Sequence, residues 1–185
     1  MKVNLGSGVG EGIKKGPDWL NIDVHPFPLT WDVQYLQWDL RRGLPTECDS
    51  MELVTSSHML EHLTHVEARL LIERCFKCLK SGGIFHSGIP NFPRLLRAYL
   101  DGDWDYILPP MMHFASNGLW AEVMTYALFN SPDDPHKSFW DVEFALWLLK
   151  DIGFINVKIV PFNPELDVDS ELRIRYTFYI AGEKP

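Results

Sequence analysis

The amino-acid sequence predicts an α/β fold, with a mostly parallel β-sheet covered by helices on both faces. Short apolar runs such as residues 51–57 and 84–89 are typical of strands buried in a parallel sheet. Segments with helical period alternate with these runs along the chain. The last two predicted strands, 156–162 and 173–181, are joined by a polar loop without a helix, so we expect them to pair antiparallel at one edge.

The composition of the chain restricts its class and its partners. With 185 residues, 46% hydrophobic and 13% aromatic, we expect a single globular domain. No apolar run approaches the roughly 18 residues of a membrane span, and the N-terminus lacks the pattern of a signal peptide, so we expect a cytoplasmic protein with no membrane partner. The net charge of -8, without a cluster of basic residues, argues against a nucleic-acid partner. The oligomeric state is not indicated.

The three cysteines do not predict a disulfide framework, because their number is odd and no secretory signal precedes them. Cys75 and Cys78 form a C-x-x-C pair within a helical pattern. A structural zinc site needs a second pair of ligands, which the sequence does not supply nearby. We therefore interpret both as thiols on a helix face.

The first half of the chain is organised around a glycine turn. The strand at residues 3–5 runs directly into Gly6, Gly8, Gly10 and Gly12, and glycine lets a backbone turn sharply and approach a ligand closely. A second strand follows at 19–24 and a third at 33–38. Only residues 10–18 separate the first two strands, too few for a normal crossover helix. We therefore expect the first helix to be truncated or missing.

Two helices and a long irregular segment are predicted in the rest of the chain. Thr64 and Glu67 have the spacing of a capping box, and Ser81-Gly82-Gly83 has the form of a helix stop. Between these signals lies a stripe of apolar residues: Val66, Leu70, Leu71, Cys75, Cys78 and Leu79.

A short helix is expected at 93–100, and another that begins at Ser138 and ends at Gly153, with Phe144, Leu148 and Leu149 facing inward. Residues 101–137 form an irregular, aromatic-rich segment that we interpret as a lid inserted into the domain.

Six motifs, in order, resemble those of a known family. The chain is similar to the class I S-adenosylmethionine-dependent methyltransferases, and within them to the "methyltransferase type 11" group. This resemblance implies a Rossmann-like sheet with strand order 3-2-1-4-5-7-6, in which the last strand is antiparallel. The matching segments are Asn4-Leu5-Gly6-Ser7-Gly8, Trp19-Leu20-Asn21-Ile22-Asp23, Asp39-Leu40, Ser56-Ser57-His58-Met59-Leu60-Glu61-His62, Leu79-Lys80-Ser81-Gly82-Gly83 and Asp151-Ile152-Gly153-Phe154.

The resemblance also implies which residues contact the cofactor, S-adenosylmethionine. The glycine turn would face the methionine moiety, Asp23 would accept hydrogen bonds from the ribose hydroxyls, and Asp39 with Leu40 would read the adenine edge. Ser57 and His58 would lie beside the sulfonium. Asn4 stands where the family usually has an acid, which removes a negative charge near the cationic cofactor. The predicted cofactor-binding set is Asn4, Gly6, Ser7, Gly8, Asp23, Asp39, Leu40, Ser57 and His58.

Methyl transfer from a sulfonium is an in-line displacement, so the protein contributes mainly alignment and proximity. A base is needed only where an acceptor O–H or N–H must lose its proton, and histidine suits that role near neutral pH. The candidate bases are His58, His62, His113 and His136; we favour His58 for its position at a strand end, and His113 or His136 because they lie in the lid. The aromatic lid suggests a small-molecule or sugar-like (saccharide) acceptor held by stacking.

The segment His58-Met59-Leu60-Glu61-His62 allows two metal interpretations. It matches the H-x-x-E-H pattern of inverted zinc peptidases, which requires both histidines on one helix. It also resembles the E-x-x-E-H of some O-methyltransferases that hold a divalent ion. We favour a third interpretation, in which Glu61 and His62 pack at a helix start, and assign no metal ligand.

Two other functions are compatible with parts of the sequence. A nicotinamide-dependent oxidoreductase would also use Asp23 to hold a ribose, but the glycines lack the G-x-G-x-x-G spacing and the helix that should follow. A non-catalytic partner protein that binds S-adenosylmethionine or another nucleotide is the other alternative, since Asn4 departs from the family and no base is unmistakable.

Overall fold

The computed structural model describes residues 1–8, 10, 12–14, 16–26, 32–106, 120–131, 133–168 and 170–185. Seven strands form one sheet in the order β3-β2-β1-β4-β5-β9-β8. Strand β9 runs antiparallel to both its neighbours and the other pairs are parallel, which confirms the predicted topology. The strands are β1 (Lys2–Leu5), β2 (Trp19–Asp23), β3 (Gln34–Gln37), β4 (Met51–Ser57), β5 (Leu79–Pro90), β8 (Ile155–Val160) and β9 (Thr177–Glu183).

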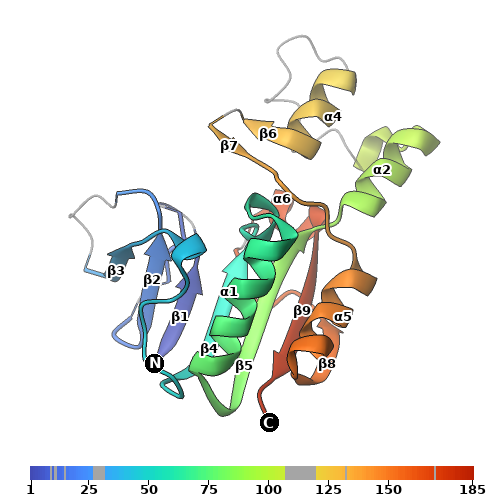
Figure 1. Ribbon diagram of the computed structural model, residues 1–185. Helices are drawn as coiled ribbons and strands as arrows, with labels where there is room; N and C mark the ends of the chain where they lie inside the picture. The colour runs from blue at the N-terminus through green and yellow to red at the C-terminus, as the bar shows by residue number, and fades with distance from the viewer. Residues whose placement is uncertain are drawn as a thin grey trace.

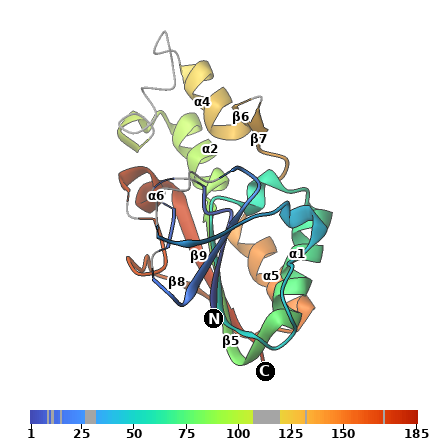
Figure 2. The same ribbon diagram turned by 90° about the vertical axis from the view of Figure 1, so that its left-hand side faces the viewer.

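The longer helices lie on one face of this sheet. Helices α1 (His65–Cys78) and α5 (Val142–Ile152) pack side by side there, and the short helix α6 (Glu171–Tyr176) lies on the opposite side (Figures 1 and 2). Two single-turn 3-10 helices, η1 (Leu40–Arg42) and η2 (Leu60–His62), follow the ends of β3 and β4. None of the helices in the described ranges is long and apolar enough for a membrane crossing.

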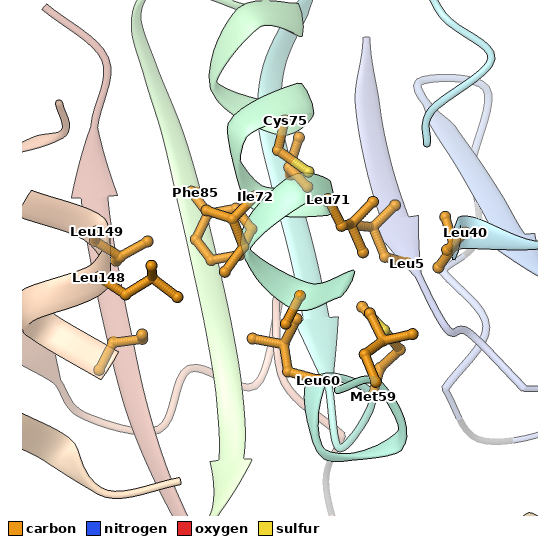
Figure 3. Packing of buried hydrophobic residues seen from close by; sticks show 14 of the residues in the cluster. Leu5, Leu40, Met59, Leu60, Leu71, Ile72, Cys75, Phe85, Leu148 and Leu149 are labelled. Atoms are coloured by element: carbon orange, nitrogen blue, oxygen red, sulfur yellow. The ribbon is translucent and has the colours of Figure 1, made fainter. Parts of the chain in front are cut away.

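The main core lies between the sheet and these two helices. Figure 3 shows Ile72 of α1 against Phe85 of β5, with Leu148 and Leu149 of α5 on one side of this pair and Leu71 of α1 on the other. All five side chains are at most 2% exposed. Truncating a buried leucine of this kind to alanine typically costs about 2–5 kcal/mol, because both transfer energy and packing are lost. The core thus fixes the sheet that carries the site.

The first crossover is short, as predicted. The described residues between β1 and β2 contain no helix, and two buried asparagines hold this connection instead. The Asn4 side chain donates to the Gly12 carbonyl (2.7 Å) and to Asn21 Oδ1 (2.9 Å). The Asn21 amide bonds both the N–H and the carbonyl of Lys14, each at 2.8 Å. These side chains satisfy backbone groups that a helix would otherwise pair.

Helix α1 has the predicted N-terminus but a different end. Thr64 and Glu67 form both bonds of the capping box. The helix stops at Cys78, and Ser81-Gly82-Gly83 continues as part of β5, with Gly82 at φ +76°. Val66 and Leu70 are 69% and 59% exposed, so the predicted stripe was wrong at these two positions. Ala68 and Ile72 are buried instead, because α5 and the sheet cover that side of the helix.

Two later boundaries also differ from the prediction. Helix α5 begins after Asp141, whose side chain caps Phe144 N, whereas Ser138 bonds the Leu63 carbonyl in the loop before it. Residues 173–176 belong to α6 and not to the last strand. The alternating Arg-Ile-Arg-Tyr pattern imitates a strand, but the Ser170 side chain accepts from Arg173 N and starts a helix.

The predicted lid contains regular structure where it is described. Helix α2 (Phe92–Asp101) leads into it, and α4 (Trp120–Phe129), β6 (Asn130–Ser131) and β7 (Asp134–Pro135) lead out. Figure 1 shows these elements beyond the carboxyl ends of the parallel strands. They share a second apolar cluster with Tyr176 of α6, formed by Leu95, Ala98, Val123, Met124 and Ala127. Residues 107–119, including His113, lie outside the described ranges.

Candidate active site

A cavity of about 750 Å³ lies at the carboxyl edge of the sheet, below the inserted elements. Its lining comes from the ends of β1, β2, β4 and β5, from the segment around η1, and from α2, α4, β7 and α6. Eight of the nine predicted cofactor residues line it: Gly6, Ser7, Gly8, Asp23, Asp39, Leu40, Ser57 and His58. The carboxyl ends of parallel strands are where α/β sheets usually bind ligands.

The glycine turn forms one wall of this cavity because its backbone approaches neighbours that a side chain would meet. Gly6 has φ +62°, and a Cβ there would lie 2.2 Å from Met59 Cγ. Gly8, at φ +61°, has no such neighbour and leaves its surroundings open. Asn4 does not line the cavity, since its amide is used within the fold as described above. Its position indicates that it shapes the turn rather than touching a ligand.

Asp23 lies at the end of β2, between the glycine turn and the cavity. Its Oδ2 accepts a hydrogen bond from Gly8 N at 2.8 Å. Its Oδ1 accepts from His25 N at 3.0 Å and lies 2.8 Å from His25 Nδ1. The imidazole of His25 is largely exposed, so it can rotate away and free an oxygen for a ligand hydroxyl. Sequence reasoning missed His25, because nothing in its pattern distinguishes it from a surface histidine.

Asp39 and Leu40 form the next part of the wall. Asp39 caps η1 by accepting from Arg41 N, and both of its carboxylate oxygens bond the Arg41 guanidinium. Hydrogen bonds from Arg41 hold the pKa of Asp39 below its usual value, so this carboxylate stays charged. Arg41 also lines the cavity and was not predicted.

His58 sits at the carboxyl end of β4 in an unusual backbone conformation, with φ +49°. Its N–H donates to the Gly88 carbonyl at 2.9 Å, which keeps the turn attached to β5. Its Nε2 lies 2.7 Å from Thr177 Oγ1, and its Nδ1 lies 3.6 Å from Glu61 Oε1. Burial, followed by the charge of Arg173, lowers the pKa of His58 well below its usual value. The imidazole is therefore neutral at neutral pH.

Glu61 is fully buried beside this histidine, and burial raises the pKa of its carboxyl to about 8. Its backbone carbonyl accepts from the N–H groups of Lys137 (2.7 Å) and Ser138 (3.1 Å). These bonds attach the segment after β7 to η2 and bring His136 against His62, with ring centroids 4.9 Å apart. Burial lowers the pKa of His136 to about 4. Sequence reasoning selected His136 but had no signal for this pairing.

Aromatic side chains from three helices line part of the cavity. Phe92, Tyr126 and Tyr176 line it. Trp104 and Tyr106 do not, because they pack in the second apolar cluster, where Tyr106 lies under the Arg94 guanidinium at 4.1 Å. Aromatic walls for an acceptor thus come from α2, α4 and α6.

The inverted zinc-peptidase pattern and the Cys75/Cys78 pair can be compared with the geometry. His58 precedes η2 in a left-handed conformation and does not share a helix with His62, so the inverted zinc-peptidase arrangement is not formed. Cys75 and Cys78 are buried free thiols of α1. Within the described part of the chain, neither cysteine belongs to a group of three metal-ligating side chains.

Comparison with known proteins gives a family match over part of the chain. Residues 5–87, from the end of β1 into β5, match the sequence model of a family described as a methyltransferase domain. No curated protein sequence matches the chain. Among solved structures, a SAM-dependent methyltransferase from Archaeoglobus fulgidus is similar in fold, with a TM-score of 0.60 at 17% identity over 99% of this chain and 85% of that one.

Two further structures share the fold. Phosphoethanolamine N-methyltransferase 2 from Haemonchus contortus, in complex with S-adenosyl-L-methionine, gives a TM-score of 0.58 at 15% identity, over 100% of this chain and 48% of that one. An O-methyltransferase family protein from Burkholderia thailandensis gives 0.55 at 16% identity, over 99% and 50%. The present chain therefore spans about half the length of these two proteins.

The family match and the sheet topology agree with the resemblance seen in the sequence. Residues 5–87 thus match the methyltransferase-domain family, and the chain shares the fold of S-adenosylmethionine-dependent methyltransferases.

Proposed function

We propose that this protein transfers the methyl group of S-adenosylmethionine to a small-molecule or sugar-like acceptor bound in the cavity. The observation that carries the proposal is the continuity of this cavity. The glycine turn, Asp23 and Asp39 line one side of the cavity. His58, His136 and the aromatic residues Phe92, Tyr126 and Tyr176 line the other side. Cofactor and acceptor would then meet at the carboxyl end of β4.

The cofactor would extend along the first side. Gly6, Ser7 and Gly8 would face the methionine moiety, and the Asp23 carboxylate would accept hydrogen bonds from the ribose once His25 rotates away. Asp39 and the backbone of Leu40 would meet the adenine. Ser57 and His58, at the end of β4, would then lie beside the methyl group.

His58 is the residue that we propose as general base. If Nε2 carries the proton and donates it to Thr177 Oγ1, then Nδ1 keeps a free lone pair. Because burial keeps the imidazole neutral, Nδ1 can take the proton of an acceptor hydroxyl as the oxygen attacks the methyl carbon. S-adenosylhomocysteine leaves. His136 remains a second candidate base, and His113 stays a prediction outside the described residues.

The test is a turnover assay with the purified protein, S-adenosylmethionine, and a panel of polyols, sugars and hydroxylated aromatic compounds. We expect S-adenosylhomocysteine release that depends on one acceptor class, and an acceptor that gains one methyl group by mass spectrometry. His58→Asn, in which asparagine tolerates the left-handed backbone, should lower kcat by about 100- to 10,000-fold. Cofactor binding with no methylation, even of a small-molecule cell extract, would favour the non-catalytic alternative.

A further inference from the structure

Three groups that accept hydrogen bonds converge at one end of the cavity, from two segments far apart in the sequence. Glu61 and His62 belong to η2, and His136 follows β7. One ligand atom from each lies within 4.8 Å of the others. Glu61 Oε1 is 4.0 Å from His62 Nε2. The backbone bonds from Lys137 and Ser138 to the Glu61 carbonyl hold the two segments together.

The Glu61 carboxylate is the unusual member of this cluster. It is 0% exposed, and no donor in the described part of the structure hydrogen-bonds either of its oxygens. Leaving a buried polar group without a partner costs about 1–3 kcal/mol, and more for a charged one. A buried carboxylate that faces imidazole nitrogens therefore needs a positive charge or a proton between them.

The Nδ1 atom of each imidazole has a neighbour outside the cluster. His136 Nδ1 lies 3.1 Å from the Leu128 carbonyl, which can only accept, so Nδ1 carries the proton. His62 Nδ1 lies 3.0 Å from Asp134 Oδ1. Histidines that ligate metals commonly donate their other N–H to a carboxylate or a backbone carbonyl, which fixes the ring and its tautomer. His136 has this arrangement, whereas the Asp134 carboxylate lies close to His62 Nδ1 without forming a hydrogen bond with it.

We propose that Glu61, His62 and His136 bind a divalent transition-metal ion such as Zn²⁺ or Co²⁺. Two imidazole nitrogens and one carboxylate oxygen suit these ions, whereas Mg²⁺ prefers oxygen ligands alone. Ligands about 2.1 Å from a tetrahedral ion lie about 3.4 Å apart. The separations of up to 4.8 Å therefore require these side chains to approach one another by up to about 1.4 Å, which small torsional changes can supply.

The site would leave coordination positions open toward the cavity. A methyl acceptor could place a hydroxyl oxygen on the ion, and a bound divalent ion makes such an oxygen easier to deprotonate. This consequence rests on the function proposed above. Metal binding itself does not, because it depends only on the three side chains and their neighbours.

The experiment measures metal binding on the full chain after removal of metals with a chelator. Co²⁺ is titrated by calorimetry and followed by its visible spectrum, and Zn²⁺ content is measured after reconstitution. We expect one ion per chain and a spectrum of low coordination number. Glu61→Gln and His136→Asn should each weaken Co²⁺ binding by about 100-fold or more, given that loss of even an outer-shell partner costs about 10- to 100-fold. His25→Asn, which alters another cavity histidine, should leave binding unchanged.

Three results would overturn the proposal: no ion bound by folded protein, equal binding by Glu61→Gln, or equal weakening in the His25 control. If no ion binds and Glu61→Gln is as stable as the parent, the carboxyl carries a proton only. S-adenosylmethionine binding is measured separately on the metal-free protein. Its loss, with metal binding intact, would refute the proposed function and leave the metal site standing.

Discussion

Replacing Gly6 with alanine tests whether the glycine turn is fixed by close approach to η2 or only by its backbone conformation. Gly6 and Gly8 have nearly the same positive φ, +62° and +61°. A Cβ on Gly6 would lie 2.2 Å from Met59 Cγ and 2.6 Å from Met59 Cβ, whereas a Cβ on Gly8 would have no heavy atom within 4 Å. Gly8→Ala is therefore a matched control for the backbone cost.

The expected loss of stability follows from these two contributions. A left-handed conformation costs an alanine about 1–2 kcal/mol at either position. At Gly6 the clash adds about 1–3 kcal/mol of overpacking, because the Cβ of Met59 is fixed to the backbone and cannot rotate away. The free energy of unfolding should thus fall by about 2–5 kcal/mol in Gly6→Ala and about 1–2 kcal/mol in Gly8→Ala.

Urea unfolding without ligand, followed by tryptophan fluorescence and circular dichroism, measures the difference. With an m-value of about 2 kcal/mol/M, the midpoint should fall by about 1–2.5 M for Gly6→Ala and about 0.5–1 M for Gly8→Ala. Adding Met59→Ala, which removes the Cγ contact, should recover part of the clash energy as a coupling term. Equal losses for the two alanine variants would refute the close-approach argument.

Two further predictions concern stability away from the cavity. Thr64→Ala should lower the unfolding free energy by about 1 kcal/mol in denaturant titrations, because it removes one half of the capping box. Hydrogen bonds from the Thr64 backbone and side chain lower the pKa of Glu67. The stability that these bonds contribute is therefore present above the ordinary glutamate pKa and is lost as the pH falls through the lowered pKa. Thr64→Ala should thus lose less stability than the parent protein when the solution is acidified. Asp167→Ala should cost about 3–5 kcal/mol, since it leaves His86 without its buried partner at 2.6 Å. Glu165→Ala, an exposed change in the same loop, should alter the unfolding free energy by no more than about 0.5 kcal/mol. If thermal melts show similar losses for the two variants, the contact between Asp167 and His86 does not contribute the stability argued here.

The parts of the fold that sequence predicted well are those fixed by local chemistry. The glycine turn after β1, the capping box at Thr64 and the short first crossover all follow from residues near one another in the chain. The order of the sheet followed from six motifs read together. The predicted buried face of α1 was wrong where tertiary contacts decide it. Val66 and Leu70 have the helical period of that face, but they are exposed.

The candidate site was predictable in one half only. The resemblance implied that residues at the ends of β1, β2 and β4 share one site, and they do line one cavity, because the strand ends of a parallel sheet meet at one edge. His136 meets His62 through backbone bonds between the segment after β7 and Glu61, and no local pattern encodes a contact across that distance in sequence. Asp134, whose carboxylate approaches His62, was missed for the same reason.

Calorimetric titration with S-adenosylmethionine and S-adenosylhomocysteine, with NAD alongside, tests most directly that this cavity holds the family cofactor through Asp23. We expect micromolar binding of both sulfur nucleotides and none of NAD. Asp23→Asn should weaken the binding of both sulfur nucleotides about 10- to 100-fold, as expected for a lost hydrogen bond to a charged group. Asp18→Asn, which removes the same charge at an exposed position, should leave their binding unchanged. No binding by folded protein would contradict the central claim, and equal binding by Asp23→Asn would contradict the ribose assignment.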